Sequence, residues 1–419
     1  MMRGLKMNKK YFIRNLLLFL FLVSISAFRL NYYIALPAFL LILIYSFIID
    51  GKIAVTGILK WGIVFWGYYL LSILWCHDVS DVLRYASAIV YIIGIFCFLP
   101  KLIKDKEEIN TVFRLVFYSI AFTAVLVLLM TPLSEYGTSR MGAAIGLNEN
   151  TFGMRMAIGA MIALFLLMKK DEKIKKALVI IFIIVFSGLT LLSGSKKGLI
   201  LLVTGLLVVI YIYSAGKQKL RRFFGALILV MGLLFLVFNN SVLYSTIGNR
   251  IERTVLTSTG QNSNSSRLQV INGTVGTTDL SLVERDYYRD QAIMLFKKYP
   301  AFGYGGNGFV THMREIGYSH VAYSHNNYTE LLCTLGIVGF VIYYSYWIIL
   351  IVRLWNIKKQ TQDEQVRKTA ALFLALLIIF LVLDYGYVSY VLEFNMFILC
   401  LADIFARLSR KEIENEAKR

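Results

Sequence analysis

The residues best suited to chemistry lie in the stretch His325-Asn326-Asn327-Tyr328-Thr329-Glu330. An imidazole, two carboxamides and a carboxylate occur here where a polar segment meets a long apolar run. Histidine changes its charge near neutral pH, so its ring can exchange a proton under physiological conditions. Polar groups at the rim of a membrane are costly to keep and are by default functional-site hypotheses. We therefore expect the functional site at this stretch.

The elements that hold these residues are predicted to be membrane helices. The chain is 58% hydrophobic and 16% charged, with a mean hydropathy of +0.66, which exceeds what a soluble globular surface tolerates. About twelve apolar runs are long enough to cross a bilayer. They lie near residues 11–28, 32–49, 53–75, 83–103, 112–132, 151–168, 177–193, 198–215, 224–240, 328–352, 369–387 and 389–406. The predicted fold is an all-α, polytopic bundle of about 12 transmembrane helices.

The distribution of Lys and Arg predicts which side each loop faces, because cytoplasmic loops retain basic residues. Basic residues gather before the first span and after the fourth and sixth, which places both termini in the cytoplasm. The predicted organisation is transmembrane helices 1–9 in residues 1–239, one large extracytoplasmic loop containing short helices in 240–327, transmembrane helices 10–12 in 328–406, and a cytoplasmic tail in 407–419.

The net charge of +19 arises mostly in these cytoplasmic connections, so the expected partners are anionic lipids and not nucleic acid. The four cysteines are widely spaced and form no metal or redox motif, which favours a packing role. His312 and His320 do not form a recognised zinc motif with His325. No metal and no cofactor is predicted.

In the large loop, apolar residues recur at helical spacing from Arg285 to Lys298, and Pro300 ends the predicted helix. Such an amphipathic helix could lie on the outer membrane surface. Arg285 and Arg289 are i,i+4 neighbours on one face, where they could bind a phosphate or pyrophosphate. Alternatively, they pair with the acidic residues beside them. The glycine-rich segment Gly303–Phe309 lacks a βαβ context, so we interpret it as a tight turn approaching a substrate or another loop.

Other polar residues are predicted at the outer rim. Arg140 lies between the fifth and sixth spans, and Asn150 precedes the sixth, where its amide could bind sugar hydroxyls or cap the helix. The turn Ser195-Lys196-Lys197-Gly198 places two lysines between very apolar spans. They could reach lipid headgroups or anchor an anionic substrate.

The pattern His325-Asn326, nine residues, Gly336, two residues, Gly339 resembles the signature of the O-antigen ligase and Wzy-type polysaccharide polymerase superfamily. In those bacterial proteins the pattern likewise ends the large external loop. The resemblance covers residues 140–345.

Other segments agree with this family in order and spacing, including Arg285, Pro300 with its glycine-rich turn, and Asn150. One segment departs from it. Family members often carry Ser-Arg-Gly where this chain has Ser195-Lys196-Lys197-Gly198, and lysine keeps the positive charge but loses the bidentate fork of arginine.

The resemblance implies an extracytoplasmic glycosyltransferase in the bacterial inner (plasma) membrane, with its active site on the outer face. It would polymerise undecaprenyl-diphosphate-linked oligosaccharide repeat units into a surface polysaccharide such as O-antigen, capsule or exopolysaccharide. The expected partners are the lipid-linked donor, an acceptor glycan and membrane lipids, with the flippase and chain-length regulator of the pathway as further candidates. The donor already stores the energy, so neither a nucleotide nor a metal is required.

The resemblance also suggests roles for the rim residues. His325 is the candidate base, and Asn326 or Glu330 could orient it. Candidates for stabilising the leaving diphosphate are Arg285, Arg289, Arg140 and Lys196. Candidates for supporting the site or binding the glycan are Asn326, Glu330, Asn150, Tyr288 and Tyr304.

Two alternatives remain open. An O-antigen ligase would transfer a finished glycan to another acceptor, whereas a polymerase extends the chain on its carrier; the lysine-rich, alanine-poor composition favours the polymerase. A lipid-linked oligosaccharide flippase or other transporter would carry charged residues through several spans. Here they concentrate at one rim and one loop, which favours an enzyme.

Overall fold

The computed structural model describes residues 2–27, 32–49, 51–135, 140–169, 174–214, 218–249, 251–252, 280–318, 320–321 and 323–416. Within these ranges, helices are the only regular secondary structure. The chain divides into two compact units that do not follow its order. The first comprises Met1–Tyr45, Glu107–Asn264 and Gly276–Asp279, and the second comprises Ser46–Lys106, Ser265–Val275 and Leu280–Arg419.

The apolar composition produces membrane-length helices, and the protein is an all-α polytopic membrane protein. Among the described residues, 8 helical segments are long and apolar enough to cross a bilayer. The apolar helices Tyr33–Ile49 and Lys176–Leu192 are shorter. Helices also occupy the two other predicted positions, at Gln218–Asn239 and Glu393–Glu416. Every predicted span therefore coincides with a helix.

The first unit is built around a central helix that is buried over most of its surface, α7 (Glu149–Met168). Its partners α8 (Lys176–Leu192) and α9 (Lys196–Tyr213) pack against it. The other elements of this unit are α1 (Met2–Ala27), most of α2 (Tyr32–Ile49), α6 (Lys106–Met130), η2 (Leu133–Glu135), η3 (Ala143–Ile145), α10 (Gln218–Asn239), α11 (Ser241–Leu243) and the π-helical turn η4 (Tyr244–Gly248).

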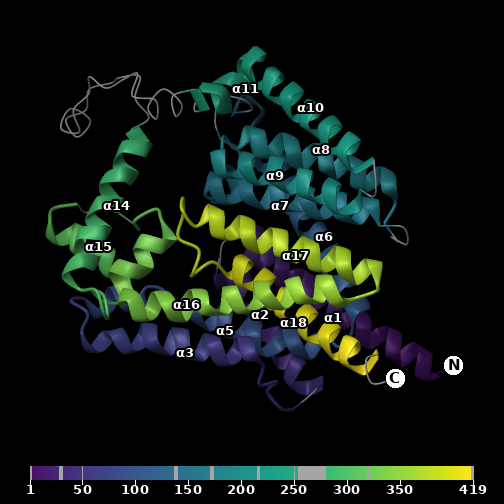
Figure 1. Cartoon of the computed structure of the whole chain (residues 1–419), viewed down its shortest axis with the longest axis horizontal. Helices are drawn as coiled ribbons and strands as arrows, with labels where there is room; N and C mark the ends of the chain where they lie inside the picture. Colours follow the sequence, from purple (N-terminus) through teal and green to yellow (C-terminus); the bar gives the residue numbers. More distant parts are fainter. Residues whose placement is uncertain are drawn as a thin grey trace. The chain divides into compact units, whose positions relative to one another are not determined.

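The second unit is built around α16 (Asn327–Gln360), which contacts α3, α14, α17 and α18. Figure 1 shows α16 in light green beneath α17. The remaining elements of this unit are α3 (Gly57–Leu71), η1 (Ser72–Leu74), α4 (Val79–Leu83), α5 (Ala86–Leu102), α14 (Leu280–Lys298), α15 (Gly308–Glu315), α17 (Glu364–Leu383) and α18 (Glu393–Glu416).

The helix predicted from Arg285 to Lys298 is confirmed as part of α14, which ends just before Pro300. Its apolar face is covered by protein, since Ala292 and Leu295 are buried in a small core with residues of α15 and α16. Figure 1 shows α14 and α15 together beside the start of α16. The suggestion that this face lies on the membrane surface is therefore wrong, because the face is already buried within the second unit.

Helix α16 is broken at Gly336, whose φ of 65° and ψ of −170° are not helical. The break frees backbone groups on both sides, and the chain after α14 pairs with them. The amides of Ile337 and Val338 donate to the carbonyls of Pro300 and Ala301, at 2.9 and 3.3 Å. In return, the carbonyls of Cys333 and Thr334 accept from the amides of Tyr304 and Gly305, at 2.8 and 2.9 Å. A broken membrane helix is tolerated only where its backbone groups are satisfied in this way.

The glycines of the family pattern and of the glycine-rich turn permit this close contact. A Cβ on Gly336 would lie 2.2 Å from the Ala301 carbonyl oxygen, and one on Gly303 would lie 2.4 Å from the Thr334 carbonyl. Both glycines have a positive φ. Gly339 instead leaves room for the Leu335 and Tyr68 side chains. The turn therefore packs its backbone against a helix, α16, where the sequence had indicated a substrate or another loop.

Candidate functional site

His325 lies immediately before α16 and has a left-handed backbone, with φ at 61°. Such a conformation is strained for a residue with a side chain, so its neighbours must hold it. Asn326 caps α16, because its side-chain oxygen accepts from the amides of Tyr328 and Thr329 at 2.9 and 3.2 Å. The buried Glu330 carboxylate accepts from the Ser324 amide at 2.7 Å.

Asn326 and Glu330 thus fix the main chain on both sides of the histidine. Among the described residues, neither side chain is hydrogen-bonded to the His325 ring. Their proposed orienting effect would act through the backbone. Glu330 is fully buried, which removes it from direct contact with a soluble substrate.

The His325 ring is half-buried between two tyrosines. Its plane is almost parallel to that of Tyr288, at an angle of 13° with 6.1 Å between ring centroids. Tyr323 lies on the chain just before it, with the ring centroids 4.3 Å apart. Aromatic faces of this kind restrict an imidazole and can also stack on sugar rings.

Asn327 anchors the start of α16 to the segment after α17. Its side-chain amide donates to Tyr344 and to Asp384, at 2.9 and 3.2 Å, and its side-chain oxygen accepts from the amides of Ser389 and Tyr390, at 2.9 and 3.2 Å. All four side-chain contacts are buried. Asn327, two positions after His325, therefore anchors the start of α16.

The two loop arginines differ in what they contact. Arg289 forms an ion pair with Asp286 at 3.1 Å and donates to the Tyr385 hydroxyl at 2.8 Å. Arg285 is half-buried and makes no hydrogen bond or ion pair with any residue that the structure describes. The acidic pairing considered from the sequence thus applies to Arg289, and Arg285 keeps its guanidinium donors.

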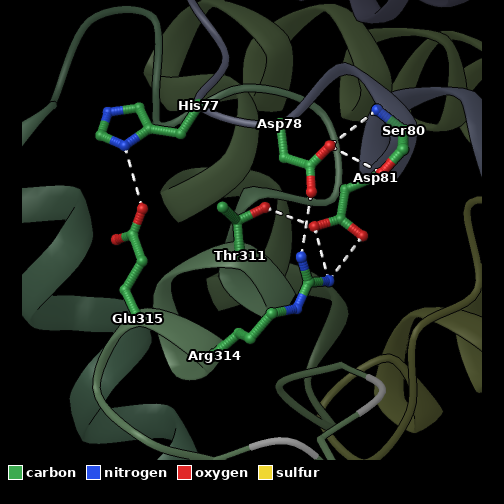
Figure 2. A network of polar contacts seen from close by, with 7 residues as sticks. All are labelled: His77, Asp78, Ser80, Asp81, Thr311, Arg314 and Glu315. Atoms are coloured by element: carbon green, nitrogen blue, oxygen red, sulfur yellow. Dashed lines mark hydrogen bonds and ion pairs between the residues drawn. The ribbon is translucent and has the colours of Figure 1, made fainter.

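A second polar network joins the segment between α3 and α5 to α15, as Figure 2 shows. Arg314 donates to both carboxylate oxygens of Asp81, at 3.0 and 2.9 Å, and to Asp78 at 3.0 Å. Thr311 donates to Asp81 at 2.7 Å. Hydrogen bonds from Ser80 and Arg314 lower the pKa of Asp78. These contacts fasten α15 to α4.

Tyr304 belongs to the same network and is buried. Its hydroxyl donates to Glu315 at 2.7 Å and lies 2.7 Å from Nδ1 of His77, which is also 3.1 Å from Glu315. Burial and the Glu315 carboxylate raise the pKa of Tyr304 well above its usual value. Burial by itself would raise the pKa of Glu315. Hydrogen bonds from Tyr304 and His77 outweigh this effect, so the pKa of Glu315 is lowered. The predicted glycan contact by Tyr304 remains a prediction, and its hydroxyl is already engaged.

Apart from Tyr304, the residues of this network were not predicted from the sequence. His77, Asp78 and Asp81 fall between the third and fourth predicted spans, on the same predicted side as His325. A histidine and two aspartates in so short a connection are the signal that could have indicated them. Their partners on α15 could not be identified without the tertiary structure.

In the first unit, Arg140 connects three segments. It donates to the Ser193 carbonyl at 2.8 Å, to Glu149 at 3.3 Å and to the Asn150 side-chain oxygen at 3.0 Å. The cap of α7 is Asn148, whose side chain accepts from the amides of Asn150 and Thr151. The suggestion that Asn150 caps this helix is therefore wrong, because its side chain binds Arg140.

Lys196 is the first residue of α9, which Ser195 caps by accepting from the Gly198 amide. The starts of α7 and α9 approach closely, since a Cβ on Gly198 would lie 2.8 Å from the Gly153 backbone. Two helix N-termini, each carrying a partial positive charge, thus adjoin Lys196. Positive charge from Lys196 and from the helix N-termini is thus gathered in this part of the first unit, an arrangement that favours an anion.

No group of three or more His, Cys, Asp or Glu side chains in the described part of the chain is arranged to hold a metal ion. Residues 177–344 match the family model for O-antigen ligase. The match begins in α8, ends in α16 and includes Lys196, Arg285 and the His325 motif. No curated protein matches the chain significantly. Over residues 177–344 the chain is therefore similar to the O-antigen ligase family, which supports the resemblance seen in the sequence motifs.

Proposed function

We propose that the protein transfers a glycan from an undecaprenyl-diphosphate carrier to an acceptor hydroxyl on the outer face of the bacterial inner membrane. The observation that carries this proposal is the position of His325. Its ring lies at the end of a membrane helix, on a strained backbone held from both sides, between the rings of Tyr288 and Tyr323. Backbone strain of this kind clusters at active sites and ligand clamps, which supports a functional role for His325.

The reaction needs a base and a stabilised leaving group. The acceptor oxygen would form a bond to the anomeric carbon as the bond between that carbon and the diphosphate oxygen breaks. The neutral His325 imidazole would accept the hydroxyl proton, and the diphosphate would leave with the bonding electron pair. Tyr288 could support a sugar ring by stacking, since its ring lies beside His325.

The leaving diphosphate requires cationic contacts. In the second unit we propose Arg285 for this role, because its guanidinium has no protein partner among the described residues. We propose that Arg289 supports the site, since it is occupied by Asp286 and Tyr385. For Lys196, at the start of α9 in the first unit, we propose a contact to an anion considered within that unit alone, with Arg140 and Asn150 holding the adjacent segments.

We favour a polymerase, which extends the glycan on its carrier, and retain a ligase as the second candidate. The name of the matched family model favours the ligase. The lysine-rich, alanine-poor composition is the reason for preferring the polymerase. A product assay distinguishes the two, because only a polymerase makes a ladder of repeat units on the donor alone.

The test uses the full chain in nanodiscs with an undecaprenyl-diphosphate-linked oligosaccharide. His325→Ala should reduce turnover by a factor of about 10² to 10⁴, as expected when a general base is removed. His320→Ala is the matched control, since His320 is exposed and lies in the same loop. It should retain wild-type turnover, and both variants should melt like the wild type.

A product ladder made by the wild type and by His320→Ala would support a polymerase. Transfer only to an added acceptor would support a ligase. Equal turnover by His325→Ala and the wild type would exclude His325 as the base. If no variant transfers glycan while the protein moves the donor between leaflets, the transporter alternative holds.

A further inference from the structure

A cavity at the other end of α16 forms a second candidate binding site. It has a volume of about 520 Å³ and lies among the ends of α16 and α18 and the start of α3. This volume falls within the range of about 300–1,000 Å³ that is usual for small-molecule sites. Three arginines line it: Arg353, Arg407 and Arg410.

The arginines are held so that most of their donors remain available. Arg353 and Arg407 share the buried Asp403 carboxylate, through Nη1 at 3.5 Å and Nε at 3.2 Å. The Tyr346 hydroxyl donates to the same carboxylate at 2.7 Å. Arg410 contacts Glu414, which also lines the cavity, through Nε at 2.7 Å.

These contacts leave the terminal nitrogens of Arg407 and Arg410 without protein partners in the described part of the chain. Three guanidinium groups adjoin two carboxylates, so positive charge is in excess. Gly57, the first residue of α3, also lines the cavity, and the first amides of a helix lack intrahelical acceptors. Paired guanidinium donors beside a helix N-terminus match the oxygens of a phosphate group.

The surroundings place this cavity at the level of lipid headgroups. The part of α16 that follows the break at Gly336 ends at Gln360 and is about 36 Å long, whereas the hydrocarbon core is about 30 Å thick. Its last turns must extend beyond that core. Trp355 is exposed there, and the Lys358 and Lys359 ammonium groups lie 5.0 and 5.3 Å from its ring. Tryptophan beside lysine is typical of the membrane–water interface.

We propose that this cavity binds a phosphate group, supplied either by the headgroup of an anionic phospholipid or by free phosphate. The site is separate from the His325 motif, which lies at the opposite end of α16, and it does not depend on the proposed transfer reaction. Phosphate oxygens would accept from the terminal nitrogens of Arg407 and Arg410 and from Arg353. A bound phosphate group would connect the C-terminal ends of α16 and α18 to the start of α3.

The test measures lipid retention by native mass spectrometry of the full-length, delipidated protein in detergent. Phosphatidylglycerol and phosphatidylcholine are added in equal amounts so that their retention can be compared. Inorganic phosphate is added in a separate experiment. Arg410→Gln should reduce retention of phosphatidylglycerol about fivefold, the effect of one basic residue near an anionic membrane surface. Arg367→Gln is the matched control, since Arg367 is exposed in the same unit and does not line the cavity.

A second variant separates binding from folding. Glu414→Gln removes the carboxylate that competes for Arg410 and should increase retention of phosphatidylglycerol, an outcome that damage to the fold would not produce. Preferential retention of phosphatidylglycerol supports the lipid source, and binding of inorganic phosphate that Arg410→Gln weakens supports the soluble source. Equal retention of both lipids with no phosphate binding, or equal effects of Arg410→Gln and Arg367→Gln, would overturn the proposal.

Discussion

Replacing Gly336 by alanine tests how the break in α16 positions the loop. The glycine has a φ of 65° and a ψ of −170°, a backbone conformation that is essentially reserved for glycine and costs an alanine about 1–3 kcal/mol. The new Cβ would also lie 2.2 Å from the Ala301 carbonyl oxygen and 2.4 Å from its carbon. Both obstacles are backbone atoms, so no side-chain rotation can relieve the clash. The chain after Pro300 must move away from α16.

That movement acts on four backbone hydrogen bonds that cross between the two segments. Each contributes about 0.5–1.5 kcal/mol, and weakening two or three of them adds to the cost of the positive φ. We therefore expect Gly336→Ala to destabilise the protein by about 3–5 kcal/mol. This corresponds to a melting temperature lower by roughly 10 °C.

The matched control is Gly67→Ala in α3 of the same unit. Gly67 lies inside a helix, and nothing lies within 4 Å of an added Cβ. Alanine there should be neutral or stabilising by about 0.5–1 kcal/mol. The assay is thermal unfolding of the detergent-purified chain, followed by loss of the monodisperse size-exclusion peak. If Gly336→Ala melts within a few degrees of Gly67→Ala, the reciprocal pairing across the break is not what holds the loop.

The polar network on α15 yields two further predictions. Asp81→Asn should lower the free energy of unfolding by about 2 kcal/mol, because the buried Asp81 carboxylate accepts one hydrogen bond from Thr311 and two from Arg314. Asp78 is more exposed, so Asp78→Asn should lower it by less, and thermal unfolding of both variants measures the difference. Equal losses would mean that burial of the Asp81 carboxylate does not matter. The folded pKa of Glu315 lies below 4.5, so its stabilising effect is complete above about pH 4.5 and is lost as the pH falls through the folded pKa. The melting-temperature difference between the wild type and Glu315→Gln should thus shrink from about pH 6 to about pH 3, and a difference that grows in acid would contradict this assignment.

The site was predicted only in part. The spacing of the His325 motif pointed to the start of α16 and to glycines inside a membrane helix. The sequence did not reveal that Gly336 breaks that helix or that the glycine-rich turn fills the break. Each glycine is compatible with a continuous helix when it is considered alone. The choice depends on a partner backbone that lies more than thirty residues away along the chain, at Pro300 and Ala301.

The membrane class, the positions of the helices and the resemblance to the O-antigen ligase family could all be predicted from the sequence, because hydropathy and residue spacing are local properties. In a bilayer, backbone polar groups must be satisfied by hydrogen bonds inside the protein, and a helix forms most of these bonds within its own segment, so an apolar run of sufficient length becomes a helix. Only the tertiary structure decided which polar side chains meet. Arg289 pairs with Tyr385 and Arg314 with Asp81 across long stretches of chain, whereas Arg285 keeps its donors. These pairings depend on how helices pack, and helix packing follows from the shapes of whole surfaces that no local pattern specifies.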